Sequence, residues 1–383
     1  MELLLEPSIG GGPISAINLT KALTDRGHSV TLVLGADTDR RIAEWVNDEL
    51  DSNVVYTLGY RGVTSLRAAL DDASDMIEGL SSNVDVVNAH GISGLAVPEE
   101  ITDRLVVTNH GHVSSRGGHI FSSTIFNRSM WSTGSLSEAA RIMVGGVLQG
   151  GYEKRACRRA QMVLTPSHFE KGQIIGGYGI DEEKVHRVPN LISLPEIAGT
   201  SPSPDSKKTL LYVGGLSTAK GTPLLVKAAR YILGRDPEAG LTVAGDGPLR
   251  GMVQRLTRDF PERVRYHGVV HGDALSSLYS SAWAFLFPSL YESFGLSMAE
   301  ALSVGLPVIA YDATAIPEMV IDGENGVLAK PYDVDDIAEK ALALLTDPDE
   351  RTRMSGNARR IVETLTDSDR TIASLEKHYR EVA

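Results

Sequence analysis

Residues 283–304 read WAFLFPSLYESFGLSMAEALSV. The segment begins as a short, continuously apolar run, which is typical of a strand covered on both faces of a parallel sheet. A turn follows, and the apolar residues after Gly295 recur at helical spacing. The segment therefore predicts a strand, a turn and a helix start, which is the repeating unit of a doubly wound α/β domain.

The rest of the chain repeats this alternation of apolar runs and helical patterns. We predict strands at 2–5, 29–34, 54–58, 84–90, 105–110 and 162–166 in the first half, and at 209–213, 241–244, 264–267, 283–287 and 307–311 in the second. Residues 193–208 are rich in Pro, Ser and Asp, as interdomain linkers are. We predict an α/β fold of two Rossmann-like domains, 1–192 and 209–365, that face a central ligand cleft.

Composition narrows the class of protein. The chain has 383 residues, 42% hydrophobic and 22% charged, as expected for a two-domain globular protein. A formal net charge of −12 argues against broad binding to nucleic acid. The single cysteine, Cys157, is expected to be a buried thiol in a reducing compartment. Residues 1–5 lack the basic start of a signal peptide, so we expect a cytoplasmic protein.

Two carboxylates flank the helix start in the opening segment. Glu292 precedes the helix and Glu300 lies on it. Backbone amides from Gly295 to Ser297 are placed to hold phosphate, while the carboxylates accept hydrogen bonds from sugar and ribose hydroxyls. The alternative is that both acids cap the helix or face solvent.

Three glycine turns follow predicted strands. Gly10-Gly11-Gly12-Pro13 opens a helix and suits a diphosphate, although its spacing is not the dinucleotide fingerprint. Gly214-Gly215 is followed by Lys220, which is placed to neutralise phosphate charge, or is merely solvated. The segment Gly245-Asp-Gly-Pro248 is interpreted as a structural turn.

In order and spacing, these motifs resemble glycosyltransferase family 4, whose members have the GT-B fold. The resemblance covers almost the whole chain and is carried by Leu23…Gly27-His28-Ser-Val30, Thr165-Pro-Ser167, Val188-Pro-Asn190, Gly214…Lys220-Gly221, Gly245-Asp-Gly-Pro248 and Glu292-x7-Glu300. It implies that Glu292 contacts the transferred sugar, Glu300 the ribose and Lys220 the diphosphate. The C-terminal residues 366–383 are expected to pack back on the first domain.

The expected site combines both lines of reasoning. His110 matches a family histidine that follows a strand, where it can reach the sugar or assist the acceptor, and His90 ends the preceding strand similarly. The expected catalytic residues are His110, Lys220 and Glu292. The expected donor-binding residues are Gly11, Gly12, Gly215, Lys220, Glu292, Phe294, Gly295, Leu296, Ser297 and Glu300.

Two positions depart from the family pattern. The family usually has arginine where this chain has Gly215, so one phosphate-binding cation is missing. The family often reads Pro-Asn-Gly-Val-Asp where this chain has Pro189-Asn-Leu-Ile-Ser193. The first departure implies either weaker neutralisation of the donor's phosphate charge or a substitute arginine from elsewhere, and it leaves Lys220 and the helix-start amides to neutralise more of that charge.

Metal and membrane contacts are separate questions. Asp-x-Asp pairs occur at Asp37/Asp39, Asp333/Asp335, Asp347/Asp349 and Asp367/Asp369. None follows a strand in a glycine loop, so we interpret them as helix caps or solvated residues and expect no metal. Residues 117–159 place apolar and basic side chains close together, which predicts either peripheral contact with the inner face of the membrane or an acceptor-side helical hairpin.

The resemblance implies transfer of a hexosyl unit from a nucleoside-diphosphate sugar, a UDP-sugar ahead of a GDP-sugar, to an acceptor hydroxyl on a glycan, a glycolipid or a small molecule. It implies retention of configuration and no cofactor. A sugar-nucleotide epimerase or a phosphorylase on the same fold is an alternative. The missing arginine at Gly215 motivates a further one, a non-catalytic sugar-nucleotide binding protein.

Overall fold

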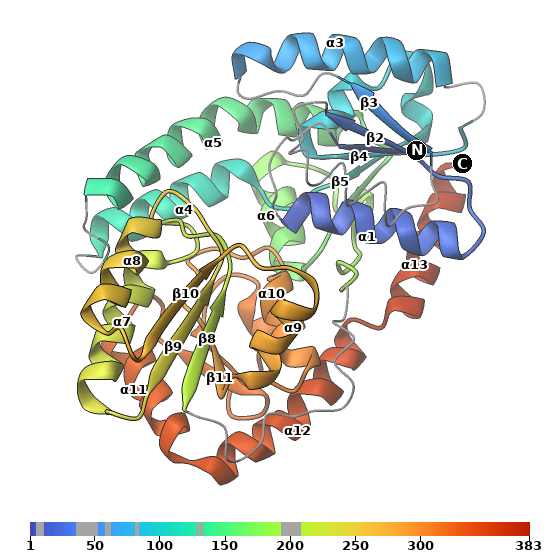
Figure 1. The fold of residues 1–383 in the computed structure, drawn as a ribbon. Helices are drawn as coiled ribbons and strands as arrows, with labels where there is room; N and C mark the ends of the chain where they lie inside the picture. The colour runs from blue at the N-terminus through green and yellow to red at the C-terminus, as the bar shows by residue number, and fades with distance from the viewer. Residues whose placement is uncertain are drawn as a thin grey trace. The chain divides into compact units, whose positions relative to one another are not determined.

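The protein is described from a computed structural model, which covers residues 1–4, 11–35, 53–57, 63–80, 84–127, 130, 133–192 and 208–383. Contacts between residues divide the chain into two compact units, drawn in Figure 1. The first unit comprises Met1–Ser115, Gly145–Ile192 and Thr366–Ala383, and the second comprises Arg116–Val144 and Ser193–Leu365.

The first unit is built on a seven-stranded parallel sheet. Its strands are β1 (Glu2–Leu4), β2 (Thr31–Gly35), β3 (Asn53–Thr57), β4 (Val87–His90), β5 (Leu105–Thr108), β6 (Met162–Thr165) and β7 (Val185–Arg187), in the order β3-β2-β1-β4-β5-β6-β7. Its helices include α1 (Gly11–Asp25), α3 (Val63–Leu80) and α6 (His168–Tyr178), and short 3-10 helices lie at Gly91–Ala96, Glu99–Arg104 and Glu182–Lys184. Helices α4 (Val113–Phe126) and α5 (Thr133–Arg159) follow β5 in sequence.

Side chains of this sheet alternate between two cores. On β5, Leu105 and Val107 pack in a cluster with α3 residues such as Ile77. Val106 packs instead in a second cluster with Leu23 of α1. Successive strand residues point to opposite faces, so apolar residues throughout β5 match a sheet covered on both sides.

The second unit repeats this plan with a six-stranded parallel sheet. The strands are β8 (Thr209–Val213), β9 (Gly240–Ala244), β10 (Val264–Gly268), β11 (Ala284–Phe287), β12 (Val308–Tyr311) and β13 (Gly326–Ala329), in the order β10-β9-β8-β11-β12-β13. The helices are α7 (Thr222–Arg235), α8 (Arg250–Asp259), α9 (Gly272–Ser281), α10 (Leu296–Ser303), α11 (Val334–Thr346) and α12 (Pro348–Leu365), with a 3-10 turn at Ile316–Glu318. The predicted α/β class with two Rossmann-like halves is confirmed.

Two strands escaped the sequence analysis. Strands β7 and β13 have three and four residues, and each lies at an edge of its sheet. Val185–Arg187 has a single apolar residue and Gly326–Ala329 begins with glycine, so neither is the continuous apolar run by which strands of similar length, such as Ala284–Phe287, were predicted. The last residue of each of the predicted strands 2–5 and 54–58 lies outside the described part of the chain. Most of the predicted linker 193–208 also lies outside it.

Residues 116–144 were assigned by sequence to the first domain, whereas their contacts place them in the second unit. The side chains explain this. His119 is hydrogen-bonded to the hydroxyl of Tyr332, and Nδ2 of Asn127 donates to the Tyr332 carbonyl oxygen at 2.7 Å. Glu138 accepts two hydrogen bonds from Thr218. Helix α4 and the start of α5 are therefore fastened to the second unit.

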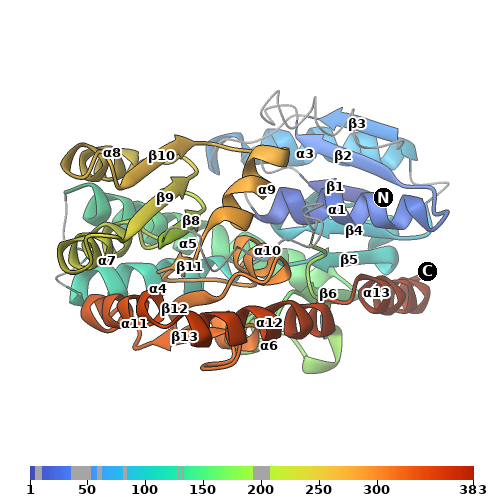
Figure 2. The same ribbon diagram turned by 60° about the horizontal axis from the view of Figure 1, so that its bottom comes forward.

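The last helix, α13 (Ser368–Val382), belongs to the first unit. Ile372 and Leu375 belong to the same core cluster as Leu23. At the surface, Arg26 and His28 pair with Glu376 at 3.0 and 3.1 Å. Figures 1 and 2 show α13, in red, at the same end of the first unit as the blue helix α1.

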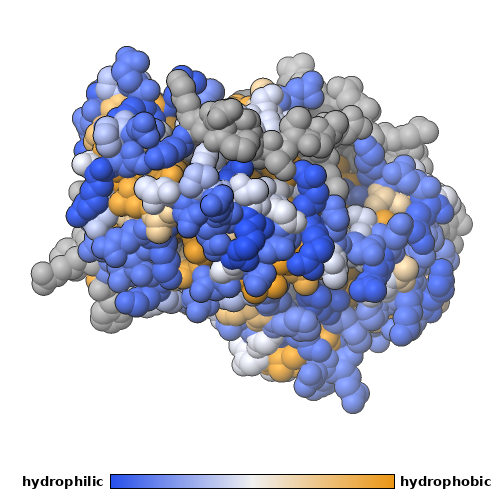
Figure 3. Space-filling model, turned by 90° about the horizontal axis from the view of Figure 1, so that it is seen from below, coloured by the Kyte–Doolittle hydropathy of each residue, from blue (hydrophilic) through white to orange (hydrophobic). Residues whose placement is uncertain are grey.

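The surface shows few apolar side chains in the described ranges. Large ones that are exposed are Ile125, Val144, Val147, Leu148, Val269 and Ile321. On the face seen in Figure 3, hydrophilic residues predominate and apolar ones form small separate areas. Among the described helices, none combines the length and apolar character required to cross a bilayer.

The packing of α13 predicts a difference between two substitutions on that helix. Leu375→Ala removes a side chain that is 1% exposed, and we expect the free energy of unfolding to fall by about 2 to 5 kcal/mol. Lys377→Ala changes an exposed lysine whose ion pair with Glu381 spans 3.9 Å, and we expect a change below about 0.5 kcal/mol. Urea unfolding of both variants checks this, and equal effects would show that α13 is not part of the core.

Candidate active site

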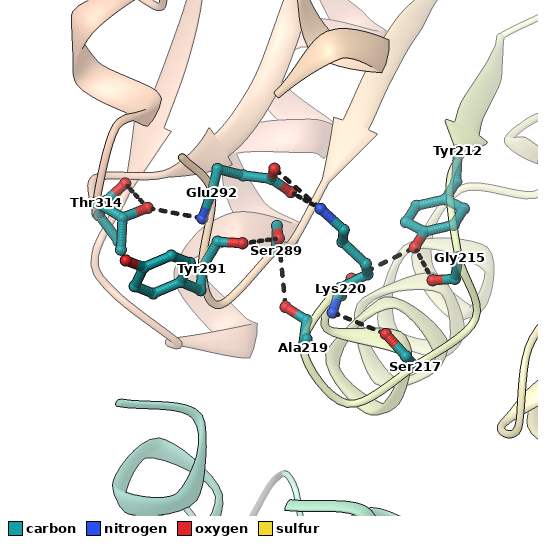
Figure 4. A network of polar contacts seen from close by, with 10 residues as sticks. Tyr212, Gly215, Ser217, Ala219, Lys220, Ser289, Tyr291, Glu292 and Thr314 are labelled. Atoms are coloured by element: carbon teal, nitrogen blue, oxygen red, sulfur yellow. Dashed lines mark hydrogen bonds and ion pairs between the residues drawn. The ribbon is translucent and has the colours of Figure 1, made fainter. Parts of the chain in front are cut away.

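The second unit holds an ion pair between two predicted site residues. Nζ of Lys220, in the loop between β8 and α7, donates to both carboxylate oxygens of Glu292, at 2.8 and 2.9 Å. Figure 4 shows the two side chains extended toward one another. The side chain of Glu292 is 5% exposed and that of Lys220 37% exposed. A nearly buried carboxylate requires a counter-charge, and Lys220 supplies it while its ammonium stays open to solvent.

One glycine brings these residues together. Gly221 has φ of 68°, and a Cβ at this position would lie 1.7 Å from the carbonyl oxygen of Pro288. Only glycine permits both the left-handed backbone and the close approach. As a result Leu290 N donates to the Ala219 carbonyl oxygen at 2.9 Å, and the Lys220 loop lies against the segment that leads to Glu292.

Gly215 lies in the same loop, and as a glycine it has no side chain that could bind phosphate. Its carbonyl oxygen accepts a hydrogen bond from Oη of Tyr212 at 2.9 Å, and Leu216 N donates to the Asp246 carbonyl oxygen at 2.9 Å. A Cβ on Gly245 would lie 2.0 Å from the Gly214 carbonyl oxygen. The turn at Gly245 is therefore structural, and it packs directly on the Gly214-Gly215 loop.

The helix start after Gly295 has the arrangement expected for an anion site. Gly295 precedes α10 with φ of 86°, and the helix begins at Leu296. Leu296 and Ser297 are partly exposed, whereas Phe294 is buried below them. The first amides of a helix have no partner within the helix and carry its positive dipole end, so they can hold a phosphate oxygen.

Glu300 lies one turn further along α10. Oη of Tyr279 donates to its carboxylate at 2.8 Å and to the Ser297 carbonyl oxygen at 3.2 Å. Glu300 is partly exposed as a residue, but its carboxyl group lies deep, and this burial raises its pKa to about 7. The hydrogen bond from Tyr279 lowers the pKa and offsets only part of that effect. Near neutral pH the carboxyl group therefore exists in both protonation states.

His110 and His90 form a close pair in the first unit. Nδ1 of His90 lies 2.6 Å from Nε2 of His110, and the rings are parallel within 2°. Burial, and to a smaller extent His90, lowers the pKa of His110 well below its ordinary value. One hydrogen is shared across the pair, and Nδ1 of His110 is buried with no hydrogen-bond partner. His110 is thus a neutral imidazole with one nitrogen uncommitted.

The remaining predicted residues fall in place as follows. Gly11 and Gly12 form the first turn of α1, where backbone amides have no partner within the helix, and Gly10 lies outside the described residues. The structure gathers Gly215, Lys220, Glu292, Phe294, Gly295, Leu296, Ser297 and Glu300 in the second unit. Gly11, Gly12, His90 and His110 belong to the first.

Sequence reasoning did not identify two side chains beside the ion pair, Tyr212 on the Lys220 side and Thr314 on the Glu292 side. Oη of Tyr212 reaches the Lys220 carbonyl oxygen at 3.5 Å, and burial with nearby Glu292 raises the pKa of Tyr212. Oγ1 of Thr314 accepts from Glu292 N at 3.1 Å, and Thr314 has φ of 55°, a strained value for a β-branched residue. Tyr212 stands two residues before Gly214 in the strand that leads to the Lys220 loop, although no role was assigned to it, and Thr314 lies in no motif.

The aspartate pairs cap helices where they are described. Asp333 accepts from Asp335 N and Asp336 N at 3.1 Å, Asp347 from Glu350 N at 2.9 Å and Asp367 from Arg370 N at 3.0 Å. Each aspartate satisfies amides that the first helical turn leaves unpaired. The pair Asp37/Asp39 lies outside the described residues.

Solved structures share this fold. That of Anabaena Alr3699/HepE in complex with UDP and glucose has a TM-score of 0.74 at 20% identity and is matched over 98% of both chains. That of sucrose-phosphate synthase from Thermosynechococcus elongatus has a TM-score of 0.76 at 19% identity, over 100% of this chain and 98% of the other. These likenesses support the two-domain fold.

Curated relatives match at the level of sequence. Alpha-D-kanosaminyltransferase of Streptomyces kanamyceticus is 28% identical over 54% of this chain and 56% of its own length. N-acetyl-alpha-D-glucosaminyl L-malate synthase of Bacillus anthracis is 24% identical over 98% of this chain and 95% of its own. The chain spans about half the length of the first of these relatives, and 41% and 35% of the lengths of two others, an uncharacterized glycosyltransferase of Methanocaldococcus jannaschii and a sulfoquinovosyl transferase of Arabidopsis thaliana.

Two family models match the two halves of the chain. Residues 9–195 match the model described as Glycosyltransferase Family 4, and residues 195–361 match Glycosyl transferases group 1. The matches meet at residue 195, close to the boundary between the two sheets, and together they extend from residue 9 to residue 361. The chain therefore belongs to glycosyltransferase family 4 and has the GT-B fold.

Proposed function

We propose that the chain transfers a hexosyl unit from a nucleoside-diphosphate sugar to an acceptor hydroxyl on a glycan, a glycolipid or a small molecule. The observation that carries this proposal is the bidentate pair of Lys220 and Glu292 beside the first amides of α10. A cation and free amides suit a diphosphate, and a nearly buried carboxylate suits sugar hydroxyls. A relative solved with UDP and glucose supports a UDP-sugar ahead of a GDP-sugar.

Each residue then has a distinct role. Lys220 and the amides of Leu296 and Ser297 stabilise the charge that develops on the departing diphosphate. Glu292 accepts hydrogen bonds from the sugar while it keeps Lys220 in place. With glycine at 215, Lys220 and the amides carry more of the phosphate charge. We further propose retention of configuration, with no metal and no cofactor, in a reaction in which the acceptor attacks on the face that the diphosphate leaves.

The first unit supplies the acceptor side of this proposal. His110 is neutral and offers the uncommitted Nδ1 for a hydrogen bond to the sugar or the acceptor hydroxyl. The amides of Gly11 and Gly12 at the start of α1 add to diphosphate binding.

The donor is identified by a thermal-shift screen with UDP-, GDP- and ADP-sugars. A ligand at 100 times its dissociation constant stabilises the protein by about 2.7 kcal/mol, and we expect one nucleotide-sugar to do so. With that donor, Lys220→Met and Glu292→Gln are expected to lower kcat about 100- to 1,000-fold, measured as release of the nucleoside diphosphate.

Lys227→Met is the matched control, because this lysine lies on α7 beyond the loop, and we expect wild-type turnover. Binding without transfer across a panel of acceptors would identify a sugar-nucleotide binding protein. Conversion of the donor without an acceptor would identify an epimerase, and dependence on inorganic phosphate a phosphorylase. A protein that no nucleotide-sugar stabilises would contradict the proposal.

Glu300 predicts a pH dependence of donor affinity. A ribose hydroxyl donates to an ionised carboxylate, and the pKa of Glu300 is raised to about 7 by burial. Donor affinity is therefore expected to rise, by about tenfold at most, from pH 6 to pH 8 as Glu300 ionises. In Glu300→Gln the same titration, followed by calorimetry, should be flat. A variant that keeps the wild-type pH dependence would remove Glu300 from the ribose contact.

We also propose a cytoplasmic location with peripheral contact at the inner face of the membrane. On α5 the exposed Val144, Val147 and Leu148 follow helical spacing, and Arg155 and Arg158 are exposed on the next turns. The joint substitution Val147→Asp and Leu148→Asp should weaken sedimentation with anionic vesicles about tenfold or more. Ile321→Asp, at an exposed apolar residue of the second unit, is the control. If both proteins sediment alike, α5 makes no such contact.

A further inference from the structure

A carboxylate from the first half of the sequence is fastened to the loop that carries Lys220. Oε2 of Glu138, on α5, accepts from Thr218 N at 2.8 Å and from Thr218 Oγ1 at 2.7 Å. Glu138 is 7% exposed and Thr218 is fully buried. Two hydrogen bonds to one buried carboxylate oxygen, one from the backbone, fix the position of Thr218 closely.

The other contacts that hold this loop have a different origin. Tyr212, the Asp246 carbonyl and Leu290 all lie in the second half of the chain. Glu138 lies within residues 9–195, the part that matches the N-terminal family model. Glu138 therefore comes from the N-terminal part of the sequence but lies in the second unit, where it contacts the loop that we propose binds the donor.

Hydrogen bonds within the loop connect Thr218 to Lys220. The Thr218 carbonyl oxygen accepts from Gly221 N at 3.0 Å, and Oγ of Ser217 accepts from Lys220 N at 3.3 Å. Thr218 and Ser217 thus define the turn that aims the lysine. Gly214 and Gly215 stand at the start of this turn, where Gly214 N donates to the Ala244 carbonyl oxygen and the Gly215 carbonyl oxygen accepts from Tyr212. Thr218 lies two residues before Lys220, so the hydrogen bonds that Glu138 accepts hold the turn close to the lysine.

We propose that Glu138 is a positioning residue for the donor loop, holding Thr218 and through it Lys220 in the geometry that reaches the donor diphosphate. This inference rests on the proposed function. Glu138 itself does not contact phosphate, because its carboxylate would repel it, so it acts only through the loop. The loop's own strands, turns and Gly221 set its overall path, and Glu138 sets where the lysine points.

A double-mutant cycle tests this. Glu138→Ala is expected to lower kcat/KM for UDP-glucose, or for the GDP-sugar if the screen selects it, by about tenfold to 100-fold in the wild-type background. In the Lys220→Met background the same substitution should change kcat/KM by less than about twofold, since the residue it positions is gone. Glu138→Gln and Thr218→Ser, which keep an acceptor and the donors, should retain most activity, and Thr218→Val should not.

Arg141→Ala, at an exposed residue of the same helix, is the control and should match the wild type. Equal losses from Glu138→Ala in both backgrounds, or no loss, would overturn the inference while the wild-type enzyme remains active. If the wild type binds donor without turnover, calorimetry of UDP and GDP replaces kcat/KM in the same cycle. If the wild type binds neither, the proposed function fails, and the inference fails with it. Should Glu138→Ala not fold, Thr218→Val takes its place in the cycle with Lys220→Met, and Thr218→Ser is its control.

Discussion

The second unit is organised around a carboxylate that is removed from water and must have a counter-charge. Glu292 is nearly buried, and Lys220 meets both of its oxygens. The pair exists because Gly221 lets the β8 loop touch the backbone at Pro288, an approach that any side chain would prevent. Thr314 has a strained, left-handed backbone, and its hydroxyl accepts a hydrogen bond from the backbone amide of Glu292. The close approach of Gly221 and the left-handed Thr314 both lie against residues 288–292, and departures from local rules of this kind occur at functional sites.

The sequence predicts those strands of the fold that are continuous apolar runs bounded by turns. Strands such as β5 and β11 are continuously apolar and bounded by turns, so pattern and length agreed on their assignment. The short edge strands β7 and β13 exist because a neighbour provides hydrogen bonds, which a local pattern does not record. The same limit applies to residues 116–144, whose place in the second unit depends on His119, Asn127 and Glu138 meeting distant partners.

In the candidate site, too, some residues could be predicted from local sequence motifs and others depend on tertiary contacts. Glu292, Glu300 and Lys220 stand in motifs whose order identifies a family, so their presence in one unit could be predicted. Tyr212, Tyr279 and Thr314, which orient them, are single residues in apolar or small-residue surroundings. Tyr279 meets Glu300 and Thr314 meets Glu292 across 21 and 22 residues of sequence, so no local pattern records these contacts. The local sequence thus identifies the charged side chains of the site, and the tertiary fold determines how they are oriented.

The return of α13 to the first unit has a consequence for biosynthesis. A ribosome releases the N-terminal sheet long before Ile372 and Leu375 emerge, although these residues complete the core that contains Leu23, Val106 and Leu164. Until then one face of the nascent sheet is left without its last apolar cover. The first unit therefore reaches its final state only after the second has been synthesised, so chain termination before residue 372 would yield an incomplete domain that is prone to aggregation.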